Sequence, residues 1–206
     1  MDKKIYIAKR VAKELDKNSV INLGIGIPSQ VAEFISDDMN IVIQSENGII
    51  GMSSSILNSL NVVNACGQMT GINKQGAYID SALSFGLIRG GHIDCTVLGA
   101  LEVDQEGNIA NWLVPGKKIS GMGGAMDLLV GAKKVIVAME HCSKGKIKIK
   151  EKCTLPLTAI KCVDLIITEM CVMKVTERGL ELVEISDGYT FDDVQSVTES
   201  RLIYEK

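Results

Sequence analysis

The start of the chain alternates between segments of helical and of strand periodicity. Apolar residues recur on one helical face within residues 3–17, and Asp2 can cap the start of this helix. A strand-like segment follows at residues 19–23, then a helix that Pro28 can open, and then a second strand at residues 40–44. Such alternation is typical of an α/β fold. We therefore predict a single open, mostly parallel sheet flanked by helices.

The same pattern continues along the rest of the chain. We expect a helix at residues 80–91, a hairpin turn at 104–107, and a last helix near Thr190 with Asp193 in the capping-box position. Further strands are expected at residues 61–65, 94–103, 135–139, 164–175 and 180–185. No linker, internal repeat or low-complexity segment interrupts the pattern, so we expect residues 1–206 to form one domain.

Composition and charge argue against several classes of protein. The net charge of −3, from 22 basic and 25 acidic residues, lacks the basic excess of a nucleic-acid binder. No apolar run approaches the roughly 20 residues of a membrane helix, and the charged start lacks the apolar core of a signal peptide. The six cysteines form no C-x-x-C pair, which disfavours a metal site and fits reduced thiols. We therefore expect a cytoplasmic protein that binds no nucleic acid, membrane or metal.

Three segments are rich in glycine: Gly24 with Gly26, Gly90 with Gly91, and Gly121 with Gly123 and Gly124. The first follows a strand and opens a helix, but Ser29 takes the place of the third glycine of a dinucleotide-binding loop. Two interpretations of these glycines stay open at this point. They allow tight turns, or they present bare backbone amides to an anion or a developing oxyanion.

Other polar residues favour structural interpretations. His92 and His141 have no Ser or Asp spacing that would suggest a catalytic triad, so we expect structural hydrogen bonds from both. Lysines alternate with other residues at positions 144, 146, 148 and 150. This pattern fits contact with an anionic ligand or, as we expect, an edge strand that lysines protect.

Glu46 lies between an apolar strand and a tight turn. The β-branched run of residues 41–43 comes before it, and Asn47-Gly48, a strong turn signal, follows it. A carboxylate in a turn is ordinarily a surface residue. Loops at the carboxyl ends of strands in α/β sheets, however, are also where ligands bind. The pattern alone leaves both interpretations open.

The stretch Ser45-Glu46-Asn47-Gly48 resembles the S-E-N-G signature of class I CoA-transferases. Further segments resemble the β subunit of that family in the same order, and together they cover about residues 4–190. They are NLGIGIP, QSENGIIGM, SFGLIRGGHID, NIANWLVPGK, GMGGAMDL, MEHCSKG, EKCTLPLT and IITE. The chain is similar to β subunits of the 3-oxoacid or acetoacetate type, which include butyrate– or acetate–acetoacetate and succinyl-CoA:3-oxoacid enzymes.

The resemblance implies a CoA-transferase-like fold and a function. Coenzyme A would pass from an acyl-CoA to a short-chain carboxylate such as acetoacetate, butyrate, acetate or succinate. Glu46 would be the nucleophile that carries CoA as a thioester, and the Gly124 backbone N–H would stabilise the oxyanion. CoA or acyl-CoA would be a substrate, and no cofactor would be permanently bound. Residues expected to line the substrate site are Gly24, Gly26, Asn47, Gly48, Gly121 and Gly123.

The resemblance also implies a partner. In the family a β half works with an α half, so we expect an α subunit and an α2β2 heterotetramer. Residues 52–67 are shorter than the usual segment, and Cys66 stands where the family often has glycine. Both departures bear on which acid is accepted. The alternatives are an acyl-CoA hydrolase or sugar-phosphate isomerase on a related fold, or a non-catalytic binding subunit.

Overall fold

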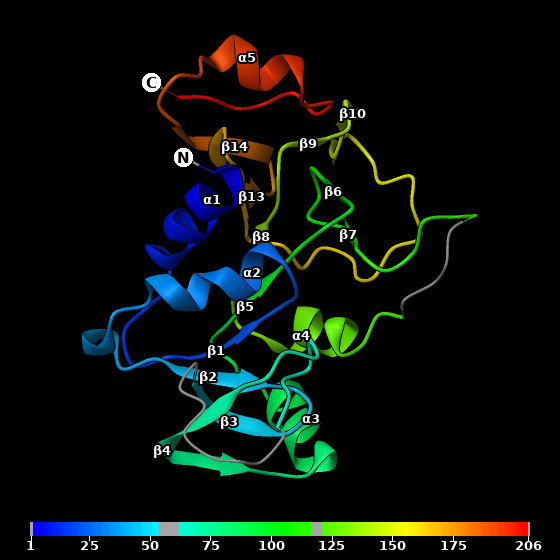
Figure 1. Ribbon diagram of the computed structural model, residues 1–206. Coiled ribbons are helices and arrows are strands. Elements are labelled where there is room, and N and C mark those ends of the chain that lie inside the picture. The colour runs from blue at the N-terminus through cyan, green and yellow to red at the C-terminus, as the bar shows by residue number, and fades with distance from the viewer. Residues whose placement is uncertain (1, 54–61, 117–120, 206) are drawn as a thin grey trace.

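A computed structural model describes residues 2–53, 62–116 and 121–205 of the chain. Its centre is a sheet in which nine described strands lie side by side (Figure 1). From one edge to the other, the strands are β14 (Gly179–Ile185), β13 (Cys171–Thr176), β12 (Leu165–Ile167), β8 (Val135–Ala138), β5 (Cys95–Leu98), β1 (Val20–Leu23), β2 (Val42–Ser45), β3 (Ile49–Ser53) and β4 (Gly71–Tyr78).

The direction of the strands changes between the middle of the sheet and its edges. The central strands β12, β8, β5, β1 and β2 pair in parallel. At the edges, β3 with β4 and β13 with β14 pair antiparallel. Short turns at residues 46–48 and 177–178 join β2 to β3 and β13 to β14, and only antiparallel neighbours can be joined by so few residues. The predicted parallel-dominated sheet is confirmed at the centre, and hairpins make the whole sheet mixed.

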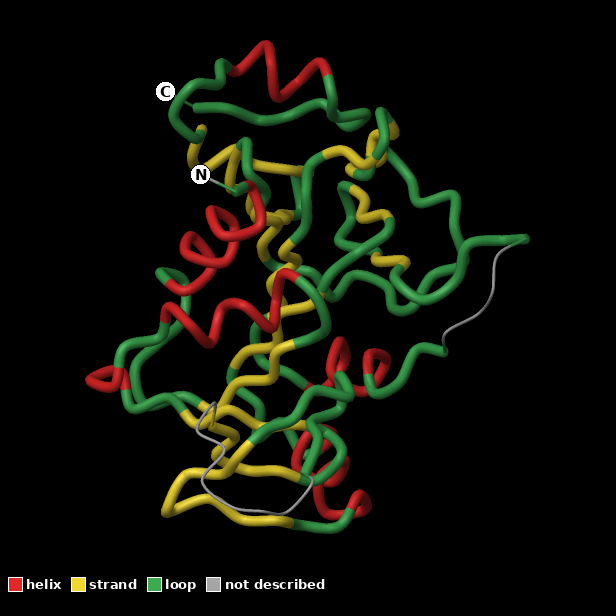
Figure 2. The backbone as a smooth tube through the Cα atoms, viewed as in Figure 1, coloured by secondary structure: helices red, strands yellow, loops and turns green. Residues whose placement is uncertain are grey.

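Helices cover both faces of the sheet, as Figure 2 shows. One face carries α1 (Lys3–Ala12), α2 (Ile27–Gln30) and the 3-10 turn η1 (Val31–Phe34), with η2 (Asp37–Met39) beyond them. The other face carries α3 (Ser81–Arg89), α4 (Ala125–Gly131) and α5 (Phe191–Ser196). None of the helices in the described ranges combines the length and the apolar character that crossing a bilayer requires.

The two apolar cores follow from the alternation of side chains along each strand. In β8, Val135 and Val137 pack into the core that α3 and α4 cover. Ile136 and Ala138 pack into the opposite core, with α1. Successive side chains of a strand point to opposite faces, so a strand covered on both sides is apolar throughout.

Two small sheets lie beside the main one. β6 (Glu102–Asp104) pairs with β7 (Ile109–Ala110) and with β11 (Ile149–Lys150). β9 (Cys142–Ser143) forms a hairpin with β10 (Lys146–Ile147). The predicted hairpin at residues 104–107 is therefore confirmed, since these residues connect β6 to β7.

Helix caps agree with the sequence predictions. The Asp2 side chain accepts a hydrogen bond from the Lys4 backbone N–H, and Asp80 caps α3 in the same way. Thr190 and Asp193 form the reciprocal capping box of α5. The first helix is shorter than predicted, because α1 ends at Ala12.

Two strand predictions are wrong. The segment 61–65 is described from residue 62, and there it makes only an isolated bridge between Val63 and Met69. The lysine-rich segment is divided into short pieces and is no continuous edge strand. Lys144 and Gly145 reverse the chain between β9 and β10, with φ of 50° and 74°. Positive φ at both positions is typical of a two-residue hairpin turn.

Candidate active site

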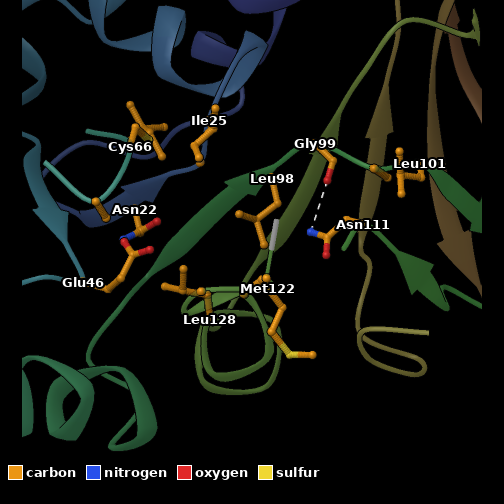
Figure 3. A pocket seen from close by; sticks show the side chains of 17 residues that line it. Asn22, Ile25, Glu46, Cys66, Leu98, Gly99, Leu101, Asn111, Met122 and Leu128 are labelled. Atoms are coloured by element: carbon orange, nitrogen blue, oxygen red, sulfur yellow. Dashed lines mark hydrogen bonds between the residues drawn. The ribbon is translucent and has the colours of Figure 1, made fainter. Parts of the chain in front are cut away.

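The carboxyl ends of three parallel strands meet at one edge of the sheet. β2 ends at Ser45, β1 at Leu23 and β5 at Leu98, and each strand continues into a loop. These loops and the glycine segment before α4 surround a cavity of about 460 Å³ (Figure 3). Its lining includes Asn22, Gly24, Glu46, Cys66, Gly121 and Gly123. Since ligands bind beyond the carboxyl ends of strands in open α/β sheets, this cavity is the candidate active site.

Glu46 is half-buried in the wall of the cavity. It is the first residue of the turn between β2 and β3, and the Gly48 N–H closes that turn on the Ser45 carbonyl at 3.0 Å. The Asn22 side chain lies beside it in Figure 3, and its Nδ2 donates to Glu46 Oε2 at 3.1 Å. The carboxylate is thus held at the cavity by an amide from the neighbouring strand, and is no mobile surface group.

A buried chain of hydrogen bonds fixes that amide. Asn22 Nδ2 also donates to Gln44 Oε1 at 2.7 Å, and Gln44 Nε2 donates to Ser84 Oγ at 2.9 Å. All three residues are at most 1% exposed. The Asn22 Oδ1 atom is buried and has no hydrogen-bond partner among the described residues. Buried amides ordinarily form hydrogen bonds through both their donor and their acceptor atoms. The Asn22 oxygen, unpaired within the described part of the chain, is therefore an unusual feature, and it belongs to a residue that lines the cavity.

The glycine segment before α4 lies against Glu46. A Cβ atom on Gly124 would stand 3.0 Å from Glu46 Cγ and 3.3 Å from the Phe85 ring. The glutamate side chain therefore occupies the space that any larger residue at position 124 would need. The structure brings Glu46 and Gly124, far apart in the sequence, into contact.

Gly24 makes a second close approach possible. Its N–H donates to the Val97 carbonyl at 2.9 Å, so the loop after β1 continues along β5. A Cβ at this position would lie 2.8 Å from Leu98 Cδ2. A side chain here would displace the end of the Leu98 side chain, which lines the cavity, and would crowd the Val97 carbonyl oxygen at 3.3 Å.

Of the other residues that the resemblance assigns to the substrate site, some line the cavity and some do not. Gly121 and Gly123 line the cavity with Gly24, whereas Gly26, Asn47 and Gly48 lie outside its lining. Asn47 is exposed, and its Nδ2 donates to the Val63 carbonyl at 2.8 Å. Gly48 has φ of +118°, and a Cβ there would collide with the Ile79 carbonyl oxygen. In this structure, the Asn47-Gly48 pair therefore shapes the turn and lies away from the cavity.

Asn22 and Gln44 were missed by the sequence analysis. The signal that could have found them is a polar residue within a strand that is otherwise apolar. Asn22 interrupts β1 near its carboxyl end, and Gln44 begins the polar end of β2, two residues before Glu46. Buried polar side chains require partners, so such interruptions indicate a polar network.

Cys66 contributes a thiol to the wall of the cavity. Burial, and then the Glu46 carboxylate, raise the pKa of this thiol above its ordinary value. Both effects disfavour the thiolate, so the group is a neutral lining residue at physiological pH.

The chain belongs to the coenzyme A transferase family, whose model matches residues 4–196. This match confirms the family that the sequence motifs predicted and makes the chain part of a CoA-transferase enzyme. The fold agrees, because two solved CoA-transferases align with 100% and 98% of this chain at TM-scores of 0.75 and 0.72.

Relatives of this chain are named as single subunits of such enzymes. It is 52% identical to the β subunit of the acetate CoA-transferase of Haemophilus influenzae, over 98% of this chain and 92% of that one. It is 47% identical to one subunit of the succinyl-CoA:3-ketoacid coenzyme A transferase of Helicobacter pylori, over 94% and 95%. A solved acyl-CoA transferase of Escherichia coli O157:H7, in a thioester complex with CoA, has a TM-score of 0.75 and 25% identity. That alignment covers 100% of this chain and 42% of the other.

Proposed function

We propose that this chain, together with an α subunit, transfers coenzyme A between an acyl-CoA and a short-chain carboxylate through a thioester on Glu46. The observation that carries the proposal is the position of the Glu46 carboxylate. It lies at the cavity, hydrogen-bonded to Asn22 and in contact with Gly124. Relatives of the chain are named for the same class of reaction.

The reaction runs in two matched halves. A carboxylate oxygen of Glu46 attacks the thioester carbonyl carbon, the C–S bond breaks, and CoA leaves as a thiolate. The thiolate then attacks the Glu46 carbonyl carbon of the resulting anhydride and releases the first acid as its carboxylate. The enzyme now carries CoA as a thioester on Glu46. A second carboxylate reverses these steps, which gives ping-pong kinetics.

The surroundings of Glu46 suit such a nucleophile. A carboxylate is weak in water, and a fixed position next to its target supplies the effective concentration that it lacks. The Asn22 amide fixes one oxygen, so the second oxygen stays available for attack. Each tetrahedral intermediate carries an oxyanion, and we assign its stabilisation to the Gly124 N–H. Loss of one such donor typically costs a factor of about 10²–10³ in rate.

The names of relatives support a substrate class and an assembly. The names of two of them specify acetate and a succinyl-CoA:3-ketoacid pair, which supports acetate, succinate and a 3-ketoacid such as acetoacetate as the acid. The motif resemblance adds butyrate to the proposed acids. Because relatives are named as β subunits, we propose an α2β2 heterotetramer whose α subunit completes the oxyanion site and the acid pocket. We place this assembly in the cytoplasm, with no permanently bound cofactor.

Trapping of the intermediate tests the proposal. Tagged chain is purified with the α subunit that accompanies it, mixed with acetoacetyl-CoA in the absence of acceptor acid, and treated with borohydride. Borohydride reduces the glutamyl thioester to an alcohol, which peptide mass spectrometry locates. We expect the modification on the peptide that contains Glu46, and a loss of transfer of at least about 10³-fold in Glu46→Gln.

A matched variant separates the specific effect from a general one. Glu33 is exposed on η1 and lines no part of the Glu46 cavity, so Glu33→Gln should keep normal transfer and trapping. Undiminished acyl exchange in Glu46→Gln would overturn the mechanism. Release of acid from acyl-CoA at the same rate with and without an acceptor acid would favour the hydrolase alternative.

A further inference from the structure

A second cavity continues the first along the edge of the sheet. It has a volume of about 170 Å³ and shares Ile25, Gly99 and Ala100 with the cavity that contains Glu46. Its far wall comes from the loop after β8 and from the segment between β10 and β11. That wall carries two charged side chains, Glu140 and Lys148. The shared residues show that the two cavities adjoin, and we refer to them together as one groove.

Lys148 differs from the other lysines of its segment. Lys144 and Lys146 are exposed, and Lys150 is paired with Glu199, whereas Lys148 is half-buried. Among the described residues, neither an ion pair nor a side-chain hydrogen bond to Lys148 is present. Burial lowers the pKa of Lys148, and the Glu140 and Glu169 carboxylates act in the opposite direction. A half-buried ammonium group that faces a cavity without a paired partner is suited to bind an anion.

The distance from Glu46 to the second cavity distinguishes between a short-chain acid and the phosphate end of CoA as the anion at Lys148. Glu46 follows β2, and the second cavity lies beyond the end of β8, three strands away in the order β2, β1, β5, β8. Neighbouring strands are about 4.8 Å apart, so the groove spans roughly 14 Å. A short-chain acid that reacts at Glu46 is too short to reach Lys148. The pantetheine arm between the sulfur and the first phosphate of CoA has the backbone length of roughly four peptide residues, about 14 Å when extended.

We propose that Lys148 binds a phosphate group of coenzyme A while the sulfur end of the same molecule lies at Glu46. This inference rests on the proposed function, because it takes Glu46 as the fixed end of the substrate. The pantetheine arm then follows the loops after β1 and β5, past Ile25, Gly99 and Ala100. Gly99 leaves this path open, since a Cβ there would come no closer than 3.9 Å to its nearest neighbour, the Ala138 carbonyl oxygen.

Glu140 shares the cavity and carries the opposite charge. It opposes an incoming phosphate, and it also helps to keep Lys148 protonated. Replacement of Glu140 by Gln removes the repulsion and leaves the lysine in place. We therefore expect Glu140→Gln to bind CoA more tightly than the unaltered protein, with a change of a few-fold.

A pair of substrates tests the role of Lys148. Acetoacetyl-CoA carries the phosphates, and acetoacetyl-pantetheine carries the same thioester without them. In the complex with the α subunit, Lys148→Gln should raise KM for acetoacetyl-CoA by about 10- to 100-fold, the usual range for one charged hydrogen bond. KM for acetoacetyl-pantetheine should be unchanged, and Lys148→Arg should restore much of the loss. Lys146→Gln, at an exposed lysine of the same segment, is the matched control and should have no effect.

Other results would overturn either the assignment of Lys148 to a phosphate or the proposed function. Equal loss with both thioesters, a raised KM for the free acid alone, or separation of the α subunit would each overturn the phosphate assignment. Unchanged KM values with normal trapping on Glu46 would overturn it and leave the proposed function intact. If the unaltered complex gives no adduct on Glu46, the function fails instead. Equilibrium binding of CoA to the unaltered and Lys148→Gln complexes then still decides the role of Lys148.

Discussion

At the residue scale, the position of the Glu46 carboxylate at the cavity depends on its neighbours in the fold. In the sequence Glu46 stands next to Asn47-Gly48, and a carboxylate there is ordinarily solvated. In the structure the turn is pressed against Ile79, which leaves Glu46 directed toward β1, where Asn22 donates to it. The orientation of the Asn22 amide is in turn fixed by Gln44. The position of one carboxylate therefore depends on a side chain that does not line the cavity.

Gln44 allows a test of this positioning role. Gln44→Met keeps the size of the side chain and removes its bonds to Asn22 and Ser84. We expect kcat to fall about tenfold or more with little change in KM, because a misplaced nucleophile affects the reacting step. Steady-state kinetics of the complex provides the measurement. Trapping on Glu46 should slow in parallel, and an unchanged kcat in a folded variant would contradict the role.

At the scale of elements, glycines at both ends of α4 set how closely it approaches α3 and the Glu46 turn. Gly124 lies against Glu46 and Phe85, and a Cβ on Gly131 would collide with the Ile88 carbonyl. The atoms next to Gly124 belong to side chains, and the nearest atoms to Gly131 belong to the backbone. Side chains beside Gly124 can move by a few tenths of an ångström, whereas the backbone beside Gly131 is fixed by α3.

The two glycines should therefore respond differently to the same change. Gly131→Ala should cost about 1–3 kcal/mol in the free energy of unfolding, because the added methyl group overpacks a rigid contact. Gly124→Ala should cost less stability but lower kcat by about tenfold or more, because the methyl group displaces Glu46. Urea unfolding and kinetics of both variants, side by side, make the comparison. Equal effects on stability and on kcat would contradict it.

At the scale of the whole molecule, His141 connects elements that are distant in sequence. It follows β8 and is fully buried. Its ring nitrogens lie 3.0 Å from Thr168 Oγ1 and 3.0 Å from Thr198 Oγ1, which come after β12 and α5. This is the structural role that the sequence predicted for it. Burial lowers the pKa of His141 from 6.5 to about 4, despite the opposing effect of Glu169.

The lowered pKa of His141 predicts an acid-sensitive fold. The unfolded chain binds a proton at this residue below pH 6.5, and the folded chain does so only near pH 4. Stability from His141 is therefore fully present above pH 6.5 and is lost as the pH falls toward 4, by up to about 3 kcal/mol. Proton NMR of the two histidines against pH, with His92→Gln for assignment, should show one ring that stays neutral until about pH 4. A His141 midpoint near 6.5 would contradict the burial argument.

The amino-acid sequence alone was enough to predict two kinds of feature. These are features that depend on a few neighbouring residues, and the family and the nucleophile that a series of motifs in a fixed order indicates. Helix caps at Asp2, Asp80 and Thr190 depend on a few neighbouring residues, and alternation of periodicity indicated the α/β class. The ordered motifs identified the family and pointed to Glu46. Backbone preferences and side-chain periods act over a few residues, so a single chain is enough to recognise them.

The meeting of distant segments became visible only in the folded chain. Folding placed Asn22 of β1 beside Glu46, brought Gly124 against the same side chain, and left Asn47 and Gly48 outside the cavity. It also turned an expected edge strand into a hairpin and put Lys148 at the far end of the groove. These results depend on strand order and on packing between residues far apart in sequence, for which local patterns carry no signal. No single segment contains the candidate active site. It forms only when the sheet brings the ends of several strands together at one edge.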